Sequence, residues 1–162
     1  PSDLYGKSKF ETELKIKKLS KKLNIKFIIL RLCTIIGPNC HSTFLSRIGD
    51  KIKHQNKLNV YGSNNYFNSC MHISTLSKNI FQIINLRKLK KNFNLITLHS
   101  KRPIKLKQIF KIFKNKLNKS VCFRELETKN KGYLIKSNQI KKYEITTDNT
   151  INAIKNYVLD LK

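Results

Sequence analysis

The chain has 162 residues, of which 40% are hydrophobic and 27% are charged. This length suits one domain with a core, or parts of two domains. The densest apolar run, at 27–37, is interrupted by Arg31, so we expect no membrane-spanning helix there. The first residues lack a basic-then-apolar signal pattern, and the four cysteines form no Cys-x-x-Cys pair. We therefore expect free thiols in a reducing, cytoplasmic compartment.

The formal net charge is +25, from 34 basic and 9 acidic residues. Such a surplus is typical of proteins that bind polyanions. Here, however, the bases are mostly lysines spread along a chain rich in Asn and Ile, which is the signature of AT-rich codons. We therefore expect no nucleic-acid partner, and we keep a basic, non-catalytic nucleic-acid- or polyanion-binding protein as the alternative. Lys105, Lys107 and Lys111 are expected to form the solvated face of a helix.

Apolar periodicity predicts alternating helices and short strands. In chain order we expect a helix at 5–23, a buried strand at 25–36, a helix at 43–55, a short strand and an Asn-rich turn within 57–70, a helix at 72–89, a strand at 93–100, a helix at 104–117, short strands at 120–126 and 132–136, and helices at 137–145 and 146–161. Ser74 or Thr75 is expected to cap the third helix, and Thr147 or Asp148 the last. This alternation predicts an α/β protein with a largely parallel sheet.

The segment YGKSK places Tyr5 and Lys9 four residues apart at the start of the first predicted helix. Residues at this spacing lie on one helix face, so the lysine ammonium would lie beside the phenol. A free tyrosine has a pKa near ~10, and a neighbouring ammonium lowers it by favouring the phenolate. Such a pair can move a proton on or off an alcohol or ketone oxygen. In a chain this rich in lysine the spacing also arises by chance, which leaves a surface tyrosine as the alternative.

Longer stretches carry a family resemblance. The segment PSDLYGKSKFETE resembles the active-site helix of the NAD-dependent epimerase/dehydratase family, the extended short-chain dehydrogenases/reductases. The segments FIILRLCTIIGPN, NVYGSNNYFNSCMHISTLSKNI, FNLITLHS and IKKYEITTDNTINAIKNYV follow in the order that the family shows. The resemblance runs along the whole chain and covers about the second half of a family member.

The resemblance implies the C-terminal part of a Rossmann-like NAD(P)-binding fold plus a small α/β substrate domain, without the N-terminal βαβ units. Residues 1–38 would be the remainder of the nucleotide-binding domain. Residues 39–162 would be mainly the substrate domain, with 72–100 returning to the Rossmann sheet. The chain has five glycines, none clustered into the family's Gly-rich turn. We therefore expect it to be inactive alone, as a truncated form, a split gene product or a pseudogene remnant.

The resemblance also implies roles for individual residues. Tyr5 would be the acid/base, and Lys9 would support it and bind nicotinamide ribose. Cys33 would make a backbone contact to the cofactor. The residues expected to bind substrate are Thr34, Asn68 and His72, with packing or helix capping as the alternative for His72. Thr34 stands where the family commonly has Asn, Asn68 where it often has Arg, and Thr75 where it usually has Asp.

The implied cofactor is NAD or NADP, and the implied substrate is a nucleotide sugar of the kind used in polysaccharide biosynthesis. Epimerisation, dehydration and reduction share the same first step, so the sequence does not choose among them. A homodimer through the helix at 5–23 is implied by the resemblance. We expect no metal site, because Cys33, Cys40 and His41 lack the spacing and the fourth ligand of a zinc centre. Arg31 is expected to be structural.

Overall fold

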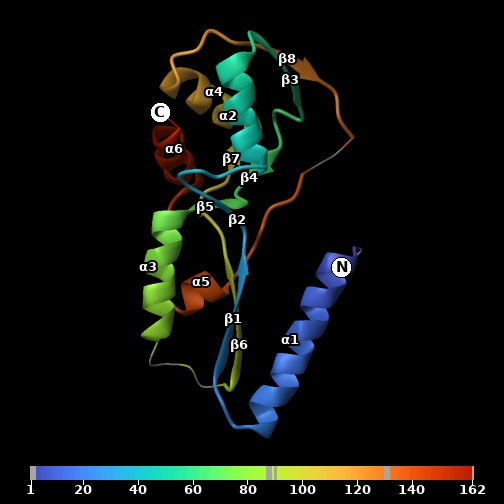
Figure 1. Cartoon of the computed structure of the whole chain (residues 1–162), viewed down its shortest axis with the longest axis vertical. Coiled ribbons are helices and arrows are strands. Elements are labelled where there is room, and N and C mark those ends of the chain that lie inside the picture. Colours follow the sequence, from blue (N-terminus) through green and yellow to red (C-terminus); the bar gives the residue numbers. More distant parts are fainter. Residues whose placement is uncertain (1–2, 87–88, 90, 130–131, 162) are drawn as a thin grey trace.

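The computed structural model describes residues 3–86, 89, 91–129 and 132–161. Helices and short strands alternate along it, which confirms the predicted α/β class (Figure 1). The helices are α1 (Leu4–Lys22), α2 (Phe44–His54), α3 (Ile73–Ile84), α4 (Leu106–Lys116), α5 (Gln139–Lys142) and α6 (Thr150–Asp160). The strands are β1 (Phe27–Leu32), β2 (Thr34–Ile36), β3 (Lys57–Tyr61), β4 (Tyr66–Phe67), β5 (Cys70–His72), β6 (Phe93–Leu98), β7 (Ile104–Lys105) and β8 (Cys122–Leu126).

The two longest strands, β1 and β6, pair in parallel, with Phe27 opposite Phe93 and Leu32 opposite Leu98. In Figure 1 α1 lies on one side of this pair, and α3 and α5 lie on the other. Ile28 and Leu30 of β1 pack on the cluster that the strands form with α3 and α5. Its buried members are Cys33, Met71, Leu76, Ile83, Ile96, Leu98, Ile140 and Ile145.

A second hydrophobic cluster lies at the other end of the molecule, where α2, α4 and α6 gather near the parallel pair β3–β8 (Figure 1). Its centre is the contact between Phe113 of α4 and Tyr157 of α6, whose ring centroids are 6.2 Å apart in an edge-on arrangement. Both rings are fully buried. The described residues thus form two cores joined through β2 and β5, and the predicted domain division at residue 38 stays a prediction.

The predicted strand at 25–36 divides at Cys33. β1 pairs with β6, whereas β2 pairs with β5, so the chain changes partner between Leu32 and Thr34. The Cys33 N–H donates to the Leu98 carbonyl at 3.2 Å and ends the first ladder. Three of the four strand pairs in the described residues are parallel, and β4–β7 is antiparallel. Each pair is a separate two-stranded sheet, so these residues do not form the single, largely parallel sheet that the sequence predicts.

Both predicted helix caps are wrong. His72 caps α3, because its side chain accepts from the Ser74 N–H, and Asn149 occupies the cap position of α6. Thr75 and Asp148, two of the expected caps, instead hydrogen-bond to each other through their side chains. This contact joins the first turn of α3 to the segment that leads into α6.

Three predicted elements are shorter or absent. The helix expected at 72–89 ends at Ile84, and residues 87 and 88 lie outside the described residues. The helix expected at 137–145 is only the single turn α5. The strand expected at 132–136 does not form. Instead, the Asn68 amide donates to the Ile135 carbonyl at 2.8 Å and accepts from the Ile135 N–H at 3.0 Å, so a side chain replaces a ladder partner.

Within the described residues, no helix combines the length and the apolar character that crossing a membrane requires.

The two hydrogen bonds between the Asn68 side chain and the Ile135 backbone, called the Asn68 clamp below, give a stability prediction. Asn68→Ala leaves two partly buried backbone groups of Ile135 without partners, so we expect the free energy of unfolding to fall by about 1–3 kcal/mol. Urea unfolding measures the loss, and faster amide exchange at Ile135 locates it. Asn152→Ala, at an exposed position of α6, is the control and should change stability little. Unchanged exchange at Ile135 would contradict the clamp.

Candidate functional site

Tyr5 and Lys9 lie in the first two turns of α1. The helix begins there because the Asp3 carboxylate accepts from the Gly6 N–H at 2.6 Å, which satisfies a donor that the first turn leaves open. The helix continues from there to Lys22. The cap fixes where the helix starts, and therefore which side of it carries Tyr5 and Lys9.

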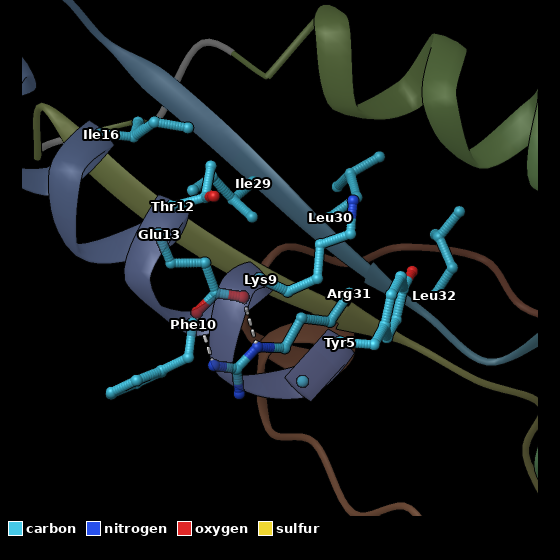
Figure 2. Close-up of a pocket in the computed structure, with 11 residues that line it drawn as sticks. Tyr5, Lys9, Phe10, Thr12, Glu13, Ile16, Ile29, Leu30, Arg31 and Leu32 are labelled. Carbon is cyan, nitrogen blue, oxygen red and sulfur yellow. Dashed lines mark hydrogen bonds and ion pairs between the residues drawn. The ribbon is translucent and has the colours of Figure 1, made fainter. Parts of the chain in front are cut away.

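A groove of about 770 Å³ runs between α1 and β1 (Figure 2). Its size lies within the range of about 300–1,000 Å³ that is usual for small-molecule sites. The residues that line it are Tyr5, Gly6, Lys9, Phe10, Thr12, Glu13, Ile16, Ile29, Leu30, Arg31 and Leu32. The predicted catalytic pair therefore lies on the wall of a groove, and not on a convex surface.

Tyr5 and Lys9 are neighbours in this groove. The Lys9 ammonium lies 5.4 Å from the centroid of the Tyr5 ring, within cation–π range. Figure 2 shows both side chains extending from α1 toward the side of β1. The Tyr5 side chain is 74% exposed, so its hydroxyl is open to a ligand from solvent. The pair has the geometry that the spacing predicts, in an open setting.

One ion pair joins the two walls of the groove. The Arg31 guanidinium on β1 donates to both carboxylate oxygens of Glu13 on α1, with N–O distances of 2.8 and 2.6 Å. This hydrogen bonding raises the pKa of Arg31 above its ordinary value. The Glu13 side chain is only 16% exposed, whereas Arg31 is 48% exposed. Arg31 therefore neutralises a largely shielded carboxylate by the two-pronged geometry that suits guanidinium.

Cys33 and Thr34 follow directly after the β1 wall. Cys33 is 8% exposed, and burial raises the pKa of its thiol to about 12, so the thiol stays protonated at neutral pH and is a poor nucleophile. Its N–H is already bound to Leu98. Thr34 is half-buried in β2, opposite Cys70. In the described residues, no group of three His, Cys, Asp or Glu side chains could hold a metal ion.

Asn68 and His72 lie away from the groove. Asn68 is 2% exposed, with its amide bound to Ile135 and within 3.1 Å of His99. His72 is 8% exposed and lies 2.8 Å from the Asp160 carboxylate of α6, in addition to capping α3. These contacts match the capping alternative for His72. The predicted substrate contacts of Asn68 and His72 stay predictions.

The groove suits one end of a nicotinamide cofactor. Tyr5 and Lys9 offer a hydroxyl and an ammonium to a ribose or carbonyl group, and Phe10 and Ile29 offer apolar surface. At the N-terminus of α1, the Gly6 N–H already donates to the Asp3 carboxylate, which places a negative charge where a pyrophosphate could bind. The groove therefore offers groups suited to a ribose, whereas this end of α1 is poorly suited to a pyrophosphate.

Glu13 and Arg31 are the groove residues whose partnership the sequence does not disclose, because they are 18 positions apart. Two signals point toward them. Glu13 continues the four-residue spacing of Tyr5 and Lys9, and Arg31 is the charged residue of an otherwise apolar strand.

No family model matches the chain, and no curated protein matches it. Solved structures match its fold along nearly all its length. A UDP-galactose 4-epimerase aligns with a TM-score of 0.77 at 14% identity, over 99% of this chain and 54% of its own. A UDP-N-acetylglucosamine 4-epimerase from Methanobrevibacter ruminantium M1, solved with UDP-N-acetylmuramic acid, aligns at 0.78 and 14%, over 99% and 54%. A dTDP-glucose 4,6-dehydratase from Bacillus anthracis, solved with NAD, aligns at 0.75 and 14%, over 99% and 52%.

These structural neighbours are nucleotide-sugar epimerases and dehydratases, and the chain spans about half of their length. The predicted fold is thereby confirmed: the chain has the α/β architecture of that half, with its parallel strand pairs.

The two buried thiols, Cys33 and Cys70, give a pH prediction. Burial raises the pKa of Cys33 and Cys70 to about 12 from an ordinary value of 9.0. The unfolded chain therefore releases these protons first, so their contribution to stability is complete below about pH 9 and falls as the pH rises toward 12. Urea midpoints measured from pH 8 to 11 under reducing conditions should fall with pH.

The double variant Cys33→Ala/Cys70→Ala should start less stable, because it leaves cavities, but it should show a shallower alkaline slope. Cys122→Ala is the matched control, because this thiol is exposed. An equal slope in the double variant and in the control would contradict the assignment.

Proposed function

We propose that this chain is the substrate-side half of an NAD(P)-dependent nucleotide-sugar epimerase, dehydratase or reductase, with Tyr5 as the acid/base and Lys9 as its support. The observation that carries the proposal is the Tyr5–Lys9 pair on the wall of the α1–β1 groove. The fold match to epimerases and dehydratases over 99% of the chain supports it.

Each residue of the proposed site would have a distinct role in the reaction. A nicotinamide cofactor, when bound, would accept or return a hydride at a hydroxyl-bearing sugar carbon. Tyr5 would take the proton from that hydroxyl and give it back, since its own hydroxyl is open to the groove. Lys9 would stabilise the phenolate electrostatically and donate to a ribose hydroxyl. Thr34, after the end of β1, and the Cys33 backbone would contact the substrate and the cofactor.

The proposed activity needs a second, nucleotide-binding half. A pyrophosphate is usually held by a Gly-rich turn at a helix N-terminus, and this sequence has no cluster of glycines. The neighbours extend over nearly as much chain again beyond the matched part. We therefore propose that the 162-residue chain does not catalyse the reaction alone. The coding DNA upstream of Pro1 tests this directly, because a Gly-rich strand–turn–helix frame there would supply the missing half.

The isolated chain should not bind NADH at micromolar concentrations. The groove can receive the nicotinamide ribose, but the pyrophosphate and the adenosine would stay in solvent. A fluorescence titration of the purified chain with NADH measures binding, and a solved NAD-binding neighbour is the positive control. Saturable micromolar binding by the chain alone would overturn the proposed incompleteness.

In a polypeptide that joins this chain to a nucleotide-binding half, Tyr5→Phe should lower kcat about 10²–10⁴-fold, because it removes the proton-transferring hydroxyl. Lys9→Gln should lower activity in the same direction. Tyr133→Phe is the control, since Tyr133 is 76% exposed and lies outside the groove. Activity is measured as epimerised, dehydrated or reduced UDP- or dTDP-sugar. Full activity of Tyr5→Phe would overturn the assigned role.

A further inference from the structure

The charged side chains that line the α1–β1 groove, within the described residues, are Lys9, Glu13 and Arg31. Tyr5, Lys9 and Glu13 follow one another at intervals of four residues, so they lie along the same side of α1. Lys9 therefore has the Tyr5 ring one turn before it and the Glu13 carboxylate one turn after it. A lysine side chain can swing to either neighbour, and a carboxylate attracts an ammonium more strongly than an aromatic ring does.

Arg31 changes this competition. Its guanidinium occupies both carboxylate oxygens of Glu13, at 2.8 and 2.6 Å, and approaches from β1 instead of from the helix. A planar two-pronged contact to a largely shielded carboxylate is stronger and more directional than a lysine contact. Figure 2 shows Glu13 turned toward Arg31, with Lys9 extending away from it. The Lys9 ammonium is at the Tyr5 ring, as its 5.4 Å distance shows.

We propose that Arg31 is a positioning residue: by holding the Glu13 carboxylate, it keeps Lys9 directed toward Tyr5. Its importance for catalysis rests on the proposed function of Tyr5 and Lys9. Its effect on the orientation of Lys9 does not, and can be measured on the 162-residue chain without cofactor or substrate.

Lys17 is the competing partner for Glu13. It lies four residues after Glu13, in the orientation that favours an acidic–basic pair on a helix. Both lysines are exposed, but Lys17 does not line the groove, whereas Glu13 and Lys9 both do. When Arg31 is lost, Lys9 is therefore the cation that we expect to turn toward Glu13.

The experiment follows the Lys9 side-chain methylene signals in a chain labelled with ¹³C-lysine. The Tyr5 ring shifts the protons above it by its ring current. Lys9→Arg identifies the Lys9 signal by its loss, and Tyr5→Leu shows how much of its shift the ring causes. Arg31→Gln should move the Lys9 signals to the position seen in Tyr5→Leu. Arg31→Lys, which keeps one charge at Glu13, should give an intermediate shift.

The decisive variant is Glu13→Gln/Arg31→Gln. It lacks the ion pair as Arg31→Gln does, but it also lacks the carboxylate that would draw Lys9 away, so the wild-type Lys9 shift should return. If the Arg31–Glu13 ion pair only stabilises the fold, Arg31→Gln and Glu13→Gln/Arg31→Gln should give the same Lys9 signals. That result would overturn the proposal. An unmoved Lys9 signal in Arg31→Gln, with Lys17 perturbed instead, would overturn it too.

Arg124→Gln is the matched control, because Arg124 is an exposed strand arginine on β8. It should leave the Lys9 signals unchanged. Urea midpoints of all variants separate reorientation of Lys9 from loss of folding. If Lys9 behaves as expected and Tyr5→Phe nevertheless leaves activity intact, the proposed function fails while the positioning role stands.

Discussion

The parallel ladder between β1 and β6 is the constraint on which the rest of the structure depends. Two parallel strands cannot be joined by a tight turn, so the chain between Leu32 and Phe93 must leave one end of the pair and return to the other. That excursion contains β2, α2, β3, β4, β5 and α3, and it supplies many of the buried residues of the second core. The partner change at Cys33 is where the excursion begins. The groove residues of β1 therefore lie just before the chain departs, the usual place for ligands in parallel α/β sheets.

The few acidic side chains make more specific contacts in the fold than the many lysines do. With 34 basic residues and 9 acidic ones, most cations must lack an acidic partner. Five of the carboxylates, in contrast, have specific partners across the fold: Asp3 with the Gly6 N–H, Glu13 with Arg31, Glu125 with Ser63, Asp148 with Thr75 and Asp160 with His72. Four of these contacts join residues that are 18 or more positions apart in the sequence. This distribution is expected if the lysine surplus reflects the composition of the chain, whereas the positions of the carboxylates are determined by their contacts in the fold.

Local sequence predicts those features that depend on neighbouring residues. Helical spacing predicts a helix at 5–23, and α1 runs from Leu4 to Lys22, with Lys9 close to the Tyr5 ring. The features missed depend on residues distant in the sequence. The Cys33 break requires β5 and β6 as alternative partners, and the missing strand at 132–136 reflects an amide 67 positions away. The His72 cap, in contrast, is a local contact with the Ser74 N–H that matches the alternative considered for this residue, whereas its contact with Asp160 lies 88 positions away in the sequence.

The exposure of the groove follows from the same ladder. β1 has the composition of a strand buried on both faces, yet among the described residues it pairs only with β6, and Leu32 is 46% exposed. No strand of the described residues pairs with its other edge, and Tyr5 on α1 is open to water. Attraction between Lys9 and an anionic group is weak in water and grows as the surroundings become less polar. A further strand on the open edge of β1 would therefore bury apolar surface and strengthen the Tyr5–Lys9 pair together. If the nucleotide-binding half of the proposed function supplied that strand, the burial of β1 and the strengthening of the proposed Tyr5–Lys9 pair would occur together.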